Sequence, residues 1–177
     1  MEEQELLKKF GIKMKKIIKY SFYGLIYVVI IIFLALMFVV TAKANIIKLN
    51  NGIEPYQVVK IQLSSLMKNN DPKKNYGIKQ TWEFAHPNNQ KHTGPLDRFT
   101  VMLQSQPYKM LLNHINHKIV EVQMSNSVAL YRVIILDINK VYYQLNWQVE
   151  KYVKNDHLKG CWLTIIVSTP ISLGSSI

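Results

Sequence analysis

The sequence contains little cysteine, glycine and proline, and each shortage excludes a class of protein. One cysteine in 177 residues excludes a disulfide framework and any metal site built from cysteines alone. Seven glycines and six prolines exclude collagen-like and low-complexity structure. Hydrophobic residues make up 49% and charged residues 19%, a balance that a disordered chain does not have. A chain of this length therefore holds one folded domain, or one domain and a tether.

Acidic residues are also scarce, since 11 Asp and Glu accompany 22 Lys and Arg, for a net charge of +11. The lysines of the loops and helix faces do not form the aromatic-interleaved pattern of single-strand-binding proteins, and no phosphate-binding loop is present, so the charge gives no specific nucleic-acid signal. We expect the charge to keep the protein near anionic lipid or an acidic partner. The chain also lacks any Asn-x-Ser/Thr motif, which disfavours a glycosylated extracellular domain.

Residues 20–42 lack charge altogether and form a continuous apolar run. At about 1.5 Å per residue, a helix of this length covers about 30 Å or slightly more, which is the thickness of the hydrocarbon core of a bilayer. A core helix would keep a polar stripe, which this run does not have. We therefore predict a single-pass transmembrane helix that acts as a signal-anchor. Six lysines precede it and two follow closely, so residues 1–19 are predicted to be a basic cytosolic tail and the rest of the chain to lie on the opposite side.

Two further interpretations of the N-terminal region stay open. Residues 42–44 (AKA) have the small-x-small form of a cleavage site, so the run could be a signal peptide cleaved after Ala44, although it exceeds the roughly 7–15 apolar residues of such signals. Residues 5–19 are amphipathic, and could lie along an anionic membrane surface or serve only as a solvated flank that sets the topology. A mitochondrial presequence fits poorly, because acidic residues begin the chain and no arginine precedes Arg98.

Residues 43–53 are predicted to form a linker, and residues 54–168 one domain that needs neither metal nor disulfide to fold. Apolar residues recur at helical spacing in the first half of this domain, and alternate with polar ones in the second half. The expected helices cover residues 54–68, 78–85, 95–103 and 107–112, and the expected strands cover 120–124, 128–136, 141–149 and 161–168. This order predicts an α+β fold with helices on one face of a curved, cone-like antiparallel sheet. Residues 169–177 are small and polar, and we expect a flexible tail.

Several motifs give the domain a family resemblance. These are QLSSLMKNND at 62–71, GIKQTWEFAHPNN at 77–89, TGPLDRF at 93–99, SQPYKMLLNH at 105–114 and the pair Cys161-Trp162. Together they resemble a domain family of bacteria, algae and plants that has no assigned function and is similar in fold to the nuclear-transport-factor-2-like, or cystatin-like cone, superfamily. The resemblance implies helices and a bent sheet that enclose a pocket. It implies no activity, because cone-fold proteins include isomerases, dehydratases, binding modules and oligomerisation domains.

The large aromatic residues of the domain are the predicted lining of such a pocket, although they could equally belong to the core. The pocket-lining candidates are Trp82, Trp147 and Trp162. An enzyme would also need a buried acid or base with a shifted pKa, and no motif assigns one. The residues that we consider for this role are Asp71, His86 and Asp97.

Other polar residues are given structural roles. His114 and His117 are three residues apart but have no third metal ligand nearby in sequence, so we predict a helix end there and no metal site. His86 and His92 are expected to flank a Pro-Asn-Asn loop after the second helix, either as ordinary loop residues or with one of them as a general base beside a pocket mouth. Arg98 is expected to pair within the domain, with anion binding as the alternative, and Cys161 to be a buried, unreactive thiol. No cofactor is predicted.

Taken together, the sequence predicts a membrane-tethered α+β binding or assembly module. The alternative is a membrane-anchored cone-fold enzyme, isomerase- or dehydratase-like, that acts on a small apolar substrate. The expected partners are the lipid bilayer and either an acidic protein or a second copy of the chain, which would pair through the outer face of the sheet. Alternation over 141–149 places Tyr143 and Trp147 toward the helices, and Tyr142, Gln144 and Gln148 outward.

Overall fold

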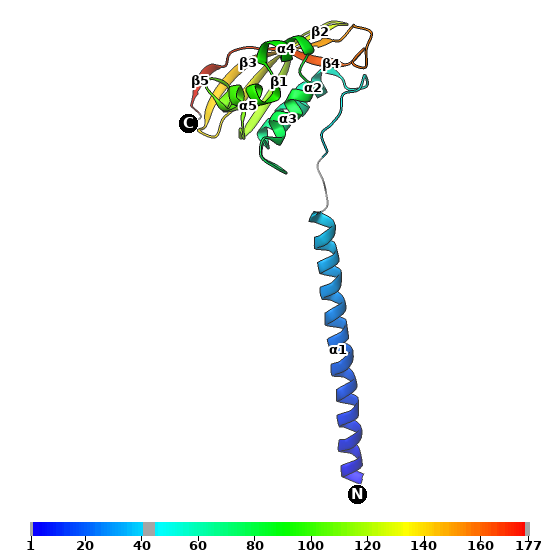
Figure 1. The fold of residues 1–177 in the computed structure, drawn as a ribbon. Helices are drawn as coiled ribbons and strands as arrows, with labels where there is room; N and C mark the ends of the chain where they lie inside the picture. The colour runs from blue at the N-terminus through cyan, green and yellow to red at the C-terminus, as the bar shows by residue number, and fades with distance from the viewer. Residues whose placement is uncertain (1, 41–44, 176–177) are drawn as a thin grey trace. The chain divides into compact units, whose positions relative to one another are not determined.

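The computed structural model describes residues 2–40 and 45–175, and within the first helix it describes the side chains of residues 13–16 and 18–35 (Figure 1). The chain divides into two compact units, Met1–Ala44 and Asn45–Ile177. The first unit is the helix α1 (Glu2–Val40). Within it, the 23-residue stretch Lys13–Ala35 is long enough, and on average apolar enough, to cross a bilayer, and it is unburied. An N-terminal signal sequence can meet the same criteria of length and composition.

Two predictions on this unit concern residues that are not described. The proposed cleavage point after Ala44 lies outside the described residues. Residues 5–19 belong to α1, but most of the side chains that would form the amphipathic surface lie outside the described part of the helix.

The second unit begins with residues that we predicted to be a linker, yet hydrogen bonds and an ion pair hold part of this segment against the domain. The backbone N–H of Ile47 donates to Gln80 Oε1 at 2.7 Å, and Gln80 Nε2 donates back to the Ile47 carbonyl at 3.0 Å. Lys48 forms an ion pair with Glu83 at 2.9 Å. Gln80 is buried, so its side-chain amide needs hydrogen-bond partners inside the protein, and the backbone of Ile47 provides them. The domain therefore starts before residue 54.

The helices of the domain are α2 (Pro55–Met67), α3 (Tyr76–Glu83), α4 (Pro87–Thr93) and α5 (Leu96–Gln104), followed by the 3₁₀ helix η1 (Tyr108–Leu111). Helix α4 corrects our prediction, which placed a loop between His86 and His92. Proline fits the first turn of a helix, where its missing N–H is not needed. The ring of His86 accepts the N–H of Asn88 at 3.0 Å, so His86 caps the helix instead of preceding a loop.

The sheet has five antiparallel strands, and together with the helices it confirms the α+β class. The strands are β1 (Asn116–Met124), β2 (Val128–Leu136), β3 (Val141–Lys151), β4 (Trp162–Val167) and β5 (Ile171–Ser175). They follow the order β1-β2-β3-β4, and β5 also pairs with β3. The predicted flexible tail is therefore wrong where β5 forms. Since β4 pairs only with residues 147–151 of the long strand β3, the edge at 141–144 is free to pair with β5.

The core lies between the sheet and the helices, among which α2 contacts β1, β3 and β4 (Figure 1). Trp147 is 1% exposed, and its cross-strand partner on β2 is the fully buried Tyr131. Tyr143 is half-buried against the same core, whereas Tyr142 is exposed. The alternation of β3 therefore places its apolar face toward the helices, as predicted, although Gln144 and Gln148 on the other face are half-buried.

Replacing Trp147 by Ala should lower the free energy of unfolding by about 3–5 kcal/mol, because a fully buried large aromatic side chain is lost. The control is Asn146→Ala on the same strand, whose exposed side chain should contribute less than about 0.5 kcal/mol. Urea unfolding of the fragment that begins at Asn45 measures both changes. Small and equal losses would show that β3 does not bury this face.

Candidate functional site

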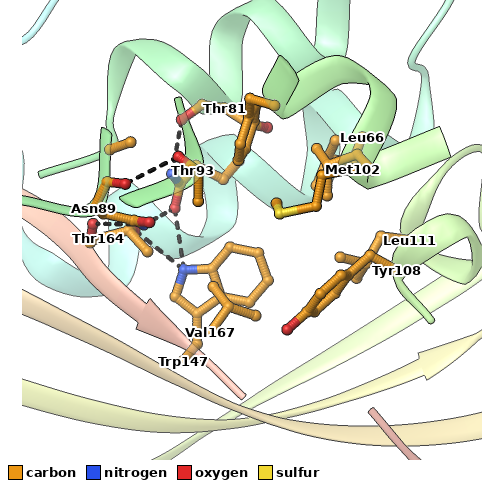
Figure 2. A pocket seen from close by; sticks show the side chains of 14 residues that line it. Leu66, Thr81, Asn89, Thr93, Met102, Tyr108, Leu111, Trp147, Thr164 and Val167 are labelled. Carbon is orange, nitrogen blue, oxygen red and sulfur yellow. Dashed lines mark hydrogen bonds between the residues drawn. The ribbon is translucent and has the colours of Figure 1, made fainter. Parts of the chain in front are cut away.

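A cavity of about 110 Å³ lies between the helices and the sheet (Figure 2). It is smaller than a cavity of about 150 Å³ that holds one benzene molecule, and far below the range of about 300 Å³ and above that is typical of drug-sized ligands. Most of its wall is apolar. The apolar lining residues are Leu66, Ala85, Phe99, Met102, Leu103, Leu111 and Val167.

One wall of the cavity is polar and neutral. The indole N–H of Trp147 lies 3.1 Å from both Gln62 Oε1 and Thr164 Oγ1, and the Thr164 hydroxyl donates to Gln62 Oε1 at 2.6 Å (Figure 2). Gln62 Nε2 donates to the Thr81 carbonyl at 3.0 Å. All four residues are buried, so these groups satisfy one another away from water. The network holds Trp147 in place without any charge.

The side of the cavity opposite Trp147 is formed by η1 and α5. Tyr108 is half-buried there, and Figure 2 shows its hydroxyl end directed across the cavity toward Trp147 and Val167. Met102 reaches into the same space from α5 (Figure 2). The Tyr108 hydroxyl makes no hydrogen bond with the part of the chain that the structure describes. It is therefore available to a ligand.

Helix α4 closes a third side of the cavity and meets the surface. Asn89 Nδ2 donates to the Thr164 carbonyl at 3.4 Å, and Thr93 Oγ1 donates to the Asn89 carbonyl at 2.9 Å. Asn89 and Val167 also line a neighbouring surface depression of about 450 Å³. The cavity thus adjoins the surface where α4 crosses β4.

The structure does not bring the three predicted tryptophans together. Trp147 lines the cavity, as described above. Trp82 packs against Phe99 with ring centroids 5.0 Å apart, and lines a separate open groove of about 540 Å³. Trp162 is buried in the core, with the Lys151 ammonium 5.8 Å from its ring. One tryptophan of the predicted set therefore belongs to the candidate site.

Sequence reasoning missed the polar partners of Trp147. Gln62 lies on the buried face of α2 between the apolar residues Val59 and Leu66. A lone amide on an apolar helix face was the signal that could have identified it, because a buried polar side chain needs a partner. Nothing comparable marked Thr164, because a threonine within the short apolar strand Trp162–Val167 is typical of an ordinary core strand.

The three acid–base candidates lie apart from the cavity. Asp71 and Asp97 are exposed. His86 is buried at the start of α4, with its ring 5.4 Å from that of Tyr152, and burial lowers the pKa of its imidazole. Among the described residues that line the cavity there is no Asp, Glu, His, Lys, Arg or Cys. The cavity wall therefore supplies neither a charge nor an acid–base pair of side chains of the kind that enzymes use near neutral pH.

His114 and His117 form a pair, but they do not share a helix. His114 lies beyond η1 and His117 is in β1, and a 2.8 Å hydrogen bond between His114 Nε2 and His117 Nδ1 joins their rings. His114 Nδ1 lies 2.7 Å from the Leu111 carbonyl. Burial, opposed by that carbonyl and reinforced by His117, lowers the pKa of His114 to about 4. Within residues 2–40 and 45–175, no group of three His, Cys, Asp or Glu residues could hold a metal ion.

The predictions for Cys161 and Arg98 have different outcomes. Cys161 is buried, and burial raises the pKa of its thiol, as expected for an unreactive cysteine. Arg98 was predicted to pair within the domain, but it is exposed and has no ion pair among the described residues. It lies over Gly94, which at φ +81° adopts the left-handed conformation, and a Cβ there would meet the Arg98 side chain at 2.6 Å.

The His114 pair makes the stability of the domain depend on pH. The pKa of the His114 imidazole is about 6.5, its ordinary value, in the unfolded chain and about 4 in the folded one, so between these values the unfolded chain binds more protons. Stability should therefore fall by about 2–3 kcal/mol as the pH drops through this window. In His114→Gln this contribution should be absent, while the exposed His92→Gln should keep it. Urea unfolding at about pH 7 and about pH 4.5 tests this, and an equal pH dependence in both variants would contradict it.

Comparisons with protein-family models, with curated proteins and with solved structures find no significant match. The resemblance of the motifs to the cone-fold family therefore stays a prediction, and the case for function depends on the geometry of the cavity.

Proposed function

We propose that the protein is a single-pass membrane protein whose α+β domain is a binding module for a small, mainly apolar molecule. The cavity beside Trp147 carries this proposal, because it combines apolar walls with a few fixed polar groups, as ligand sites do. Binding is favoured over catalysis because the polar wall consists of an amide, two threonines and an indole that are already hydrogen-bonded to one another or to the backbone.

The proposal includes a sheet that curves around the helices like a cone. Bulges or irregularities interrupt the pairing of β1 with β2, of β3 with β4 and of β3 with β5. Bulges bend strands and increase their twist, so they support curvature. The resemblance of the motifs to the cone-fold family supports the same arrangement.

The proposed topology has the N-terminus in the cytosol and the α+β domain on the opposite side of the membrane. It is supported by the length and apolar character of Lys13–Ala35 and by the excess of lysines before the apolar run. An uncleaved anchor is favoured over a signal peptide because the run is longer than the apolar part of ordinary signals.

The lipid bilayer is the first proposed partner, and an acidic protein is the second. Arg132 is exposed between the buried residues Tyr131 and Val133, so it points away from the helices. Exposed Lys118 lies on the same face, since it pairs with Ile134, two residues beyond Arg132. These cations favour an acidic partner over a second copy of the chain, which would bring like charges together.

The topology can be tested with the full chain carrying a C-terminal tag. We expect the tagged protein to stay in the membrane pellet after carbonate extraction, at its full mass, and to resist protease in vesicles whose cytosolic face is outward. A matched variant with glutamine at the six lysines before residue 20 should lose the fixed orientation. Release into the supernatant, loss of the N-terminal segment, or digestion of the tag in intact vesicles would each contradict the topology.

Xenon can test the cavity, because it enters small apolar cavities without specific contacts. In the full chain held in lipid nanodiscs, xenon should shift the NMR signal of the Trp147 indole N–H. Met102→Trp should abolish this shift by filling the cavity, and Val101→Trp should preserve it, because Val101 is 62% exposed on the same helix. A folded protein whose Trp147 signal does not respond to xenon would rule out an accessible binding site.

A further inference from the structure

The cavity restricts both the size and the charge of what it can bind. A volume of about 110 Å³ is below the roughly 150 Å³ of a cavity that holds benzene, so the site admits an apolar group of at most about one six-membered ring. Burying a charged group in such a site costs a large free energy unless an opposite charge pairs with it. The described lining residues provide no such charge. The part of the ligand inside the cavity is therefore neutral.

Some hydrogen-bonding groups around the cavity already have a partner in the protein, and others do not. On the side of Trp147, the side chains of Gln62, Trp147 and Thr164 are hydrogen-bonded to one another. On the opposite side, the Tyr108 hydroxyl faces the cavity without a partner among the described residues (Figure 2). A tyrosine hydroxyl both donates and accepts, so it can pair with an alcohol, a phenol or a carbonyl oxygen.

From this asymmetry we infer that the site selects a neutral ligand with a compact apolar group of about six carbon atoms next to one oxygen, and that Tyr108 binds this oxygen. The inference rests on the proposed binding function and adds the ligand class to it. In this arrangement the apolar group fills the space between Met102 and Trp147. Tyr108 determines specificity, because it supplies the polar contact that distinguishes an oxygenated molecule from a hydrocarbon of the same shape.

Benzene, phenol and benzoate form a matched set of probes, since they share a ring and differ in oxygen and charge. Their binding can be followed through the Trp147 indole signal of the full chain in lipid nanodiscs, with free probe concentrations measured against empty discs. We expect phenol to bind about 2- to 10-fold more tightly than benzene, as one hydrogen bond predicts, and benzoate to bind more weakly than either.

Tyr108→Phe should reduce the affinity for phenol to that for benzene and leave benzene binding unchanged. The control is Tyr56→Phe, since Tyr56 is 46% exposed and lies on α2 away from the cavity lining. The ratio of phenol to benzene affinity in the unsubstituted protein needs no variant, so the inference stays testable even if Tyr108→Phe does not fold.

Three outcomes would overturn the inference while the binding function stands. Benzene and phenol could bind equally, benzoate could bind as tightly as phenol, or Tyr108→Phe could retain the preference for phenol. Failure of all three probes and of xenon to perturb Trp147 would instead remove the proposed binding function itself.

Discussion

The packing of the helices on the sheet depends on the hydrogen bonds that the indole N–H of Trp147 makes. Trp147 is among the largest fully buried side chains, and its N–H cannot reach water. Gln62 Oε1 and Thr164 Oγ1 both accept this N–H. One polar atom of β3 therefore contacts helix α2, at a residue 85 positions away in sequence, and strand β4, at a residue 17 positions away. A buried donor without a partner would cost about 1–3 kcal/mol, so these contacts favour one position of α2 on the sheet.

The same network explains why a cavity is present beside a well-packed core. Gln62 and Thr164 are oriented toward Trp147, and Gln62 is also tied to Thr81 on α3, so none of them extends into the space bounded by α5 and η1. Apolar side chains from those elements surround that space without filling it. Apolar cavities of this size hold water poorly, so the vacant volume favours an apolar occupant.

Much of the fold could be predicted from the sequence because its signals are local. The alternation in β3 and the β-branched run of β2 identify strands that the structure contains at 141–151 and 128–136. Two errors have tertiary causes. Pro87 begins a helix because the ring of His86 caps it, and β5 forms because β4 leaves the edge of β3 unpaired. The site was less predictable still, since Trp147 was found by its size, whereas Thr164 and Tyr108 reach the cavity only through the packing of distant elements.

The proposed anchor and the proposed ligand class are chemically consistent with each other. A neutral molecule with a compact apolar group partitions into or near a bilayer, whereas a charged molecule of the same size stays in water. A module held at the membrane by one apolar helix would therefore encounter such molecules at a higher local concentration than a free domain does. This concentration effect compensates for a cavity whose small apolar area limits affinity, because burying about one ring contributes only a few kcal/mol. The proposed tether and the small neutral cavity would thus act together, with the membrane raising the local ligand concentration and the domain selecting the ligand.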